Sequence, residues 1–365
     1  MKPTIKISLL VSVALVIFLG LECKKKPVEP NENDKLGRRD YTWTIDTLSY
    51  PGSYQTTMRD MYAVDAKNIY VVGHNDQNRG HMYHYDGNIW KPVGLHISEG
   101  GQISGAINLF AIYGFGANNI WAVGSISFSN PTPPPIWYDS SLIIHFDGSQ
   151  WSEVSITRRK LLPSIGGTKQ NLWAGGLEGT LYHFNGSFWS LDTLPVFYSS
   201  RYVWGVLAMA SLDPMKTVMS LTVLDQTNGF TTNIFLMRTK TSWQIIDSFK
   251  VDTSNLKPKW GHARFWTSPQ EKLYSVGHGL FVYANNTWKK LYQGENALSG
   301  IGGTREKHMF VSGAYSTLLH YNGKDWYSYS PIADPTLGYS ALWCSENEVF
   351  VLANDGYKTF IIHGK

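Results

Sequence analysis

Apolar and polar residues alternate on both sides of four Asp-Gly or Asn-Gly pairs. The four stretches read YHYDGNIWKP, IHFDGSQWSE, YHFNGSFWSL and HYNGKDWYSY. Alternation of this kind is typical of a β-strand with one buried face. Asp-Gly and Asn-Gly favour a type I′ turn because they tolerate positive φ at both central positions. The pattern predicts four hairpins, each with a tryptophan in its second strand: Trp90, Trp151, Trp189 and Trp326.

The same unit recurs between these hairpins in a weaker form. Trp288 follows an Asn-Asn pair in YANNTWKKL, and Trp243 follows RTKTS. Apolar stretches before each hairpin predict two more strands per unit. The second of these strands lies near 68–73, 119–124, 171–176, 217–224, 272–277, 308–313 and 348–353. Four strands in roughly 40 to 50 residues match one blade of a β-propeller.

The two ends of the pattern are complementary. Residues 348–365 supply inner strands but no tryptophan strand, whereas 41–48, YTWTIDTL, is a tryptophan strand with no unit before it. We predict that these two stretches pair, because their pairing completes a seventh blade and removes an exposed terminal edge. The expected fold class is all-β: a seven-bladed β-propeller closed by its N-terminal strand.

Two of the units carry a family resemblance. NIWAVG…IIHFDGSQW and NLWAGGLEGTLYHFNGSFW resemble the propeller repeats of two-component-regulator sensor proteins and related secreted bacterial propellers. The resemblance runs from about residue 40 to the end and implies a propeller without implying an activity, because this fold hosts many functions. Lipid-anchored bacterial propellers of this kind act as scaffolds in envelope assembly or as ligand binders.

The N-terminus resembles a bacterial lipoprotein signal. Lys2 and Lys6 precede fifteen apolar residues, 7–21, which suit a signal peptide better than a membrane span. We expect a signal at 1–22, a lipidated Cys23 opening a disordered tether at 23–40, and the propeller at 41–365. The implied location is the bacterial cell envelope, most simply the outer membrane. The alternative is an uncleaved N-terminal anchor.

Charge and cysteine content narrow the possible partners. The chain has 32 Lys and Arg against 28 Asp and Glu, and residues 1–40 contain eight of those bases and five of those acids. The propeller body is therefore nearly neutral, which does not support nucleic-acid binding. With Cys23 lipidated, Cys344 has no disulfide partner, so packing must stabilise the fold.

One histidine position recurs, and we interpret it as structural. The position holds Met237 and Val282 in two units, so it accepts an apolar side chain. Equivalent points in neighbouring blades also lie too far apart to share one metal ion. We expect packed, hydrogen-bonded histidines and no metal or other cofactor. The position is occupied by His84, His145, His183, His320 and His363.

The loops differ in length, and the long ones predict a binding face. They join second to third strands and fourth strands to the next blade, and in a propeller both sets lie on one face. Aromatic residues and arginine dominate interface hot spots, although these side chains may instead pack their own loops. The candidate partner-binding residues are Trp137, Tyr138, Arg158, Arg159, Tyr198, Arg201, Trp204, Trp260 and His262.

No enzyme signature stands out in the chain. Walker, HExxH, GxSxG and CxxC patterns are missing. The sequence therefore favours a monomeric, non-catalytic propeller that binds a protein or glycan of the cell envelope through its long-loop face. The alternative is a hydrolase or lyase acting on polysaccharide or peptide at the mouth of the central channel, because propeller enzymes assemble their sites from several blades.

Overall fold

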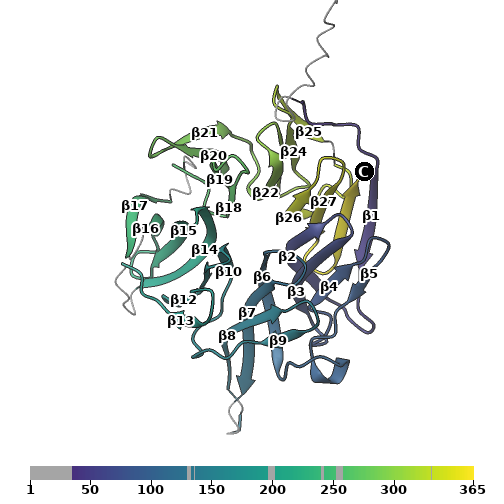
Figure 1. Ribbon diagram of the computed structural model, residues 1–365, viewed down its shortest axis with the longest axis vertical. Helices are drawn as coiled ribbons and strands as arrows, with labels where there is room; N and C mark the ends of the chain where they lie inside the picture. Colours follow the sequence, from purple (N-terminus) through teal and green to yellow (C-terminus); the bar gives the residue numbers. More distant parts are fainter. Residues whose placement is uncertain are drawn as a thin grey trace, which may run out of the picture. The chain divides into compact units, whose positions relative to one another are not determined.

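We analysed a computed structural model, which describes residues 35–129, 133–134, 136–195, 202–239, 242–251, 258–329 and 331–365. The chain from Leu36 to Lys365 is one compact unit. The strands in this described part form seven four-stranded antiparallel sheets, the blades of a ring (Figure 1). The described residues include one short 3-10 helix, η2 Ile97–Glu99. They contain no helix long and apolar enough to cross a membrane. The all-β, seven-bladed prediction is confirmed.

The blades are numbered in chain order. Blade 1 contains β2 Thr56–Asp65, β3 Asn68–Asn75, β4 Met82–Tyr85 and β5 Trp90–Pro92, and blade 2 contains β6 Ala106–Gly114, β7 Ile120–Ser129, β8 Trp137–Phe146 and β9 Trp151–Glu153. Blade 3 contains β10 Ser164–Thr168, β11 Asn171–Gly175, β12 Leu181–Phe184 and β13 Trp189–Leu191. Blade 4 contains β14 Tyr202–Asp213, β15 Lys216–Asp225, β16 Thr231–Thr239 and β17 Ser242–Lys250.

The remaining three blades complete the ring. They contain, for blade 5, β18 Arg264–Thr267, β19 Leu273–Gly277, β20 Gly279–Ala284 and β21 Thr287–Tyr292; for blade 6, β22 Leu298–Arg305, β23 His308–Gly313, β24 Leu318–Tyr321 and β25 Trp326–Tyr329; for blade 7, β26 Gly338–Cys344, β27 Val349–Asn354, β28 Thr359–Gly364 and β1 Trp43–Leu48.

The closing strand is placed as predicted. β1 pairs antiparallel with β28, from Trp43 opposite Gly364 to Leu48 opposite Thr359. Blade 7 therefore has the strand order β26-β27-β28-β1, with its outer strand taken from the start of the propeller (Figure 1). Because β1 pairs along the edge of β28, that edge is not exposed to solvent. The same hydrogen bonds join the two ends of the ring.

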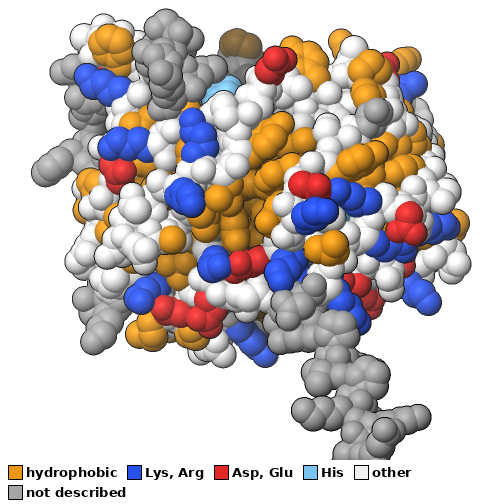
Figure 2. Space-filling view, turned by 90° about the horizontal axis from the view of Figure 1, so that it is seen from above, with side chains coloured by type: hydrophobic (Ala, Val, Ile, Leu, Met, Phe, Trp, Pro, Cys, Tyr) orange, Lys and Arg blue, Asp and Glu red, His pale blue; other side chains and the backbone are white. Residues whose placement is uncertain are grey.

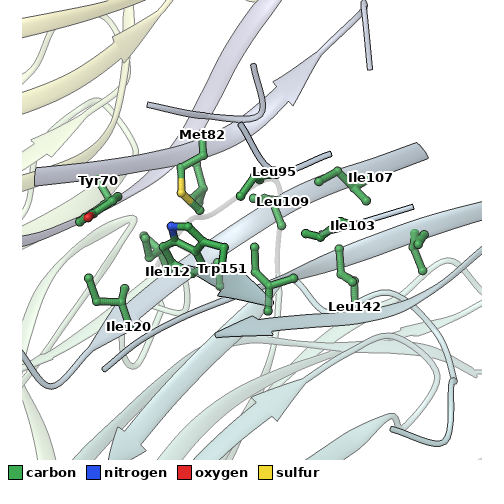
Figure 3. Close-up of a cluster of buried hydrophobic side chains, with 14 residues drawn as sticks. Tyr70, Met82, Leu95, Ile103, Ile107, Leu109, Ile112, Ile120, Leu142 and Trp151 are labelled. Atoms are coloured by element: carbon green, nitrogen blue, oxygen red, sulfur yellow. The ribbon is translucent and has the colours of Figure 1, made fainter. Parts of the chain in front are cut away.

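Hydrophobic clusters fill the spaces between neighbouring blades. Figure 3 shows the cluster between blades 1 and 2, where Tyr70 and Met82 of one blade meet Leu109, Leu142 and Trp151 of the next. The described residues form one such cluster at each of the seven interfaces. Each blade thus buries both of its faces against its neighbours, which a single four-stranded sheet cannot do.

The recurring tryptophans lie in these interfaces, as the sequence predicted. Trp151 is 6% exposed and Trp243 5%, and the other five are partly buried. Each packs on a different cluster. The seven are Trp43, Trp90, Trp151, Trp189, Trp243, Trp288 and Trp326.

The prediction of two-residue type I′ turns at the Asp-Gly and Asn-Gly pairs was wrong. In blade 2 the connection between β8 and β9 has four residues, and only Gly148 has positive φ, at 100°. The Asp147 carboxylate accepts the backbone N–H groups of Ser149 (2.8 Å) and Gln150 (3.0 Å). This side-chain cap replaces the backbone conformation that a type I′ turn would need at the aspartate.

The degenerate Asn-Asn pair of blade 5 instead makes a two-residue turn. Asn285 and Asn286 have φ of 52° and 58°, and they connect Ala284 directly to its strand partner Thr287. Asparagine tolerates the left-handed region better than most residues, so this pair supports the turn type that the sequence analysis had assigned to its neighbours.

The chain enters the ring across the rim of blade 6. The Arg39 guanidinium lies 2.6 Å from the Asp325 carboxylate in the turn between β24 and β25. Tyr41 is buried, and the backbone N–H of Gly37 donates to blade 6. The segment Leu36–Asp40, which the sequence analysis assigned to the tether, thus contacts the propeller. The signal peptide and the rest of the tether lie outside the described residues and stay predictions.

Candidate functional site

The recurring histidines stack on an aromatic residue of the same blade. The His145 ring lies 3.9 Å from the Trp121 ring, centroid to centroid, and His145 Nε2 is 3.1 Å from Asn119 Oδ1. Where the histidine is missing, Val282 faces Tyr274 instead. The equivalent stacked pairs are His84 on Tyr70, His183 on Trp173, His320 on Phe310 and His363 on Phe350.

These contacts make the histidines structural residues of the blades. Burial lowers the pKa of His145, so the ring is neutral when it stacks. The described residues contain no group of three or more His, Cys, Asp or Glu side chains placed to hold a metal ion.

The first strand of every blade lines the central channel. Asp60 and Arg264 face each other there from blades 1 and 5, with Arg264 Nη2 2.7 Å from Asp60 Oδ1. Asp60 Oδ2 also accepts the backbone N–H of Ile112 from blade 2. The pair therefore ties three blades together across the channel. At the same strand position the other blades carry small residues: Ala111, Ser164, Ala208, Gly300 and Ala341.

The cavity beside this pair contains one carboxylate among its described lining residues. Its volume is about 120 Å³, and that carboxylate belongs to Asp60. A hydrolase or lyase needs groups that accept and donate protons near the substrate. Here the one carboxylate is 7% exposed and already neutralised by Arg264.

Two aromatic residues among the predicted partner-binding residues are exposed on the long-loop face. Trp137 is 63% exposed and Tyr138 55%, at the start of β8. Arg158 lies in the same region, but its guanidinium hydrogen-bonds Glu153 and Ser141 and stacks over Phe128, 4.9 Å from the ring centroid. Arg158 thus packs its own blade.

The other predicted residues are not brought together with this pair. Trp260 is fully buried between blades 4 and 5, 4.6 Å from the Phe249 ring, so its assignment as a surface contact was wrong. His262 is half-buried in the same region, and burial lowers its pKa. Arg159 is exposed and bonds Ser141 through its backbone. Tyr198, Arg201 and the side chain of Trp204 lie outside the described residues.

A groove opens beside Trp137, between blades 1 and 2. Its volume is about 660 Å³. Apolar side chains come from both blades: Ile97 lies on the η2 loop after blade 1, and Phe128 and Trp137 on the hairpin β7–β8. Arg79 is the one charged residue among the described lining residues. The rest of the lining is largely polar and includes Gln77, Asn78 and four serines, so the groove joins an aromatic wall to hydrogen-bonding groups. A concave surface that combines apolar side chains with polar groups is typical of a binding site.

Buried histidines lie under this groove. His81 and His96 are 1% and 6% exposed, with ring centroids 5.7 Å apart. Burial, with the two neighbouring histidines, lowers the pKa of His81 to about 3, so this layer is uncharged at neutral pH. His96 lines the groove and packs against the buried His81, so the η2 loop rests on a buried, uncharged layer.

Exposed aromatic side chains concentrate on the long-loop face. Eight aromatic residues of the described chain are strongly exposed, and six lie in or beside loops of this face. Phe188 is on the short-turn face and Tyr327 on an outer strand. The six are Tyr54, Trp137, Tyr138, Phe230, Tyr315 and Tyr357.

The loop lengths and the aromatic and arginine residues of the sequence did not point to Arg79, Ile97 or Phe128. No pattern in one loop shows which other loop it meets. The channel pair did leave a signal, because Asp60 and Arg264 are charged at a repeat position that is otherwise Ala, Ser or Gly.

Comparisons with known proteins identify the fold and no family. No family model matches the chain, and no curated protein matches it. Solved structures do: YCF48 bound to D1 peptide has 14% identity and a TM-score of 0.57, covering 90% of this chain and 98% of its own. The WD40 propeller domain of Doa1 has 13% identity and a TM-score of 0.55, covering 88% and 96%.

A virginiamycin B lyase from Staphylococcus aureus with quinupristin is also similar. It has 10% identity and a TM-score of 0.52, covering 88% of this chain and 99% of its own. At such low identity these likenesses show a shared propeller fold alone, since binding proteins and a lyase share it.

Proposed function

We propose that this protein is a non-catalytic binding propeller that holds a partner protein on its long-loop face, while lipid on Cys23 anchors it to the bacterial cell envelope. The groove between blades 1 and 2 carries this proposal. It brings Ile97, Phe128 and Trp137 from separate loops into one concave surface.

Two observations support a protein as the partner. Aromatic residues are enriched in protein–protein interfaces, and six exposed ones share this face. Among the similar folds, YCF48 is bound to a D1 peptide, which is a precedent for peptide binding by such a ring. A glycan would be an outcome of the test below.

Site-specific photocrosslinking in the native host tests the proposal. A photoreactive phenylalanine analogue replaces Trp137 or Ile97 in the full-length protein, and matched substitutions replace Phe188 and Met215 on the short-turn face. We expect a discrete protein adduct from the first two positions only. Equal adducts from both faces, or adducts that contain glycan and no peptide, would contradict a protein partner on the long-loop face.

The anchor is tested separately. Wild-type protein should incorporate radioactive palmitate and sediment with membranes, whereas Cys23→Ser should do neither. A Cys344→Ser variant is the matched control, because that cysteine is buried in the blade 6–7 interface. Palmitate incorporation by Cys23→Ser would exclude the lipoprotein assignment.

A further inference from the structure

The chain itself occupies one of the grooves between blades at the outer rim. Tyr41 lies between blades 6 and 7, with its ring centroid 5.9 Å from that of Phe310, 6.5 Å from that of Tyr329 and 5.6 Å from that of Trp43. The ring is 9% exposed. A short extended segment can therefore anchor at the rim by inserting one aromatic side chain between two blades.

The residues before Tyr41 fit the same groove closely. A Cβ atom on Gly37 would come within 2.4 Å of His308 Nδ1. The Arg39 guanidinium pairs with Asp325 and lies over the Tyr327 ring, 5.2 Å from its centroid. The segment Gly37–Tyr41 therefore matches this groove in shape and in charge. Its arginine, Arg39, lies two residues before the inserted aromatic residue, Tyr41.

The equivalent groove between blades 5 and 6 is open, with a volume of about 440 Å³. Its apolar walls include Tyr274, Leu291 and Trp326. By strand pairing, Tyr274 and Trp326 hold the repeat positions of Phe310 and Trp43 around Tyr41. A bulge in β21 gives the position of Tyr329 to Tyr292, which packs against Trp326. Figure 2, seen from above Figure 1, shows hydrophobic side chains in a hollow of this rim bordered by Lys and Arg side chains.

A similar groove of about 480 Å³ lies between blades 2 and 3. There His145 stacks on Trp121 and covers one wall. Between blades 5 and 6 the histidine position holds Val282, and the Tyr274 ring has no stacked cover. The groove between blades 5 and 6 is therefore the better apolar receptor for an aromatic side chain.

The filled groove between blades 6 and 7 and the open groove between blades 5 and 6 differ in charge on both sides of the blade tryptophan. Lys289 of blade 5 and Tyr327 of blade 6 each follow the tryptophan of their blade. Where the acidic Asp325 attracts Arg39 in the filled groove, blade 5 has the neutral Thr287. Lys289 lines the open groove and makes no ion pair within the described residues, whereas its neighbour Lys272 is paired with Glu306 (2.6 Å).

From this correspondence we infer that the groove between blades 5 and 6 binds an extended segment of a partner protein in the register of Gly37–Tyr41. An aromatic residue of that segment inserts between the blades, and an acidic residue two positions before it faces Lys289. The aromatic ring takes the place of Tyr41 against Tyr274 and Trp326. The carboxylate takes the place of Arg39. This site lies on the rim, so it is separate from the groove of the proposed function.

Blocked, fluorescently labelled hexapeptides provide the probe. LGRRDY copies residues 36–41, LGREDY changes its second arginine to glutamate, and LGREDA then removes the aromatic residue. Binding to the full-length protein in detergent is measured by fluorescence anisotropy. We expect LGREDY to bind saturably, and LGRRDY and LGREDA to bind at least about tenfold more weakly, because LGRRDY brings a second cation to Lys289 and LGREDA lacks the ring that fills the groove.

Two variants of β21 give the matched test. Lys289→Glu should weaken LGREDY about tenfold and make LGRRDY the better ligand. Lys290→Glu makes the same change in net charge, but its ammonium group bonds Gln293 (2.9 Å) outside the groove, so it should change either affinity less than about twofold. No saturable binding of LGREDY below about 1 mM, or an equal loss in both variants, would overturn the inference. Neither result bears on crosslinking from Trp137.

Discussion

The two faces of the ring follow different rules. On the short-turn face, Asp86, Asp147, Asn185 and Asn322 each accept two backbone N–H groups in a turn of the same form. On the long-loop face only Asp355, between β27 and β28, makes a turn of this form among the described residues. The connections between second and third strands there range from one residue, between β19 and β20, to seven, between β7 and β8, and exposed aromatic residues gather on this face. Repeated positions therefore build the ring, and the positions without a repeat shape its surface.

The closing strand gives the severest test of the repeated part. Deleting Trp43–Leu48 removes the six residue pairs between β1 and β28 and exposes the edge of β28. We expect the cooperative thermal transition to be lost, because the last blade then lacks its outer strand and cannot complete its contacts with the neighbouring blades. Circular dichroism as a function of temperature measures this transition. An unchanged melting temperature would show that the ring does not depend on closure.

A pair of tryptophans contrasts the two rules directly. Trp151→Ala empties a site that is 6% exposed and should cost about 3–5 kcal/mol. Trp137→Ala removes a side chain that is 63% exposed and should change stability by less than about 0.5 kcal/mol while abolishing crosslinking at the long-loop face. Urea denaturation measures both. Similar losses of stability would remove the distinction between the faces.

The ion pair between Asp60 and Arg264 in the channel does not follow the repeat, and we expect it to stabilise the fold. Arg264→Gln leaves the buried Asp60 carboxylate without its partner, which should cost about 2–3 kcal/mol because Arg264 is itself one-third exposed. Adding Asp60→Asn should recover part of that loss. If the single variant unfolds like wild type, the pair contributes nothing to the ring, and a role in ligand binding would have to be considered.

The histidine position predicts a smaller, pH-dependent effect. Burial, with His308 beside it, lowers the pKa of His320 to about 3, below the value of about 6.5 expected in the unfolded chain. The unfolded state therefore binds the proton first. Stability is fully present above pH 6.5 and falls toward pH 3, by at most about 1.4 kcal/mol per pH unit for this group.

The variant His320→Met should flatten that dependence, because Met237 already occupies the equivalent position in blade 4. Unfolding free energies from pH 7 to 4 measure the change. A parallel pH dependence in wild type and variant would mean that folding does not shift the pKa of His320.

The repeat explains which features were predictable. Blade number, ring closure and the stacked histidines all follow from residues that recur at fixed spacing. The turn conformation did not follow, because the Asp147 side chain supplies hydrogen bonds that a rule based on backbone preference ignores. The groove did not follow either, since Ile97 and Trp137 meet only through the packing of two blades.

Closure by β1 also orders events in time. Thr44 hydrogen-bonds His363, 319 positions along the chain, so this contact forms only after nearly the whole propeller has been made. Pairing over such a separation carries a large loop-closure entropy and slows folding. Until then β28 presents a free edge that can capture other strands. The chain in which β28 is made but not yet paired with β1 should therefore be the form of this protein most prone to strand capture by another chain.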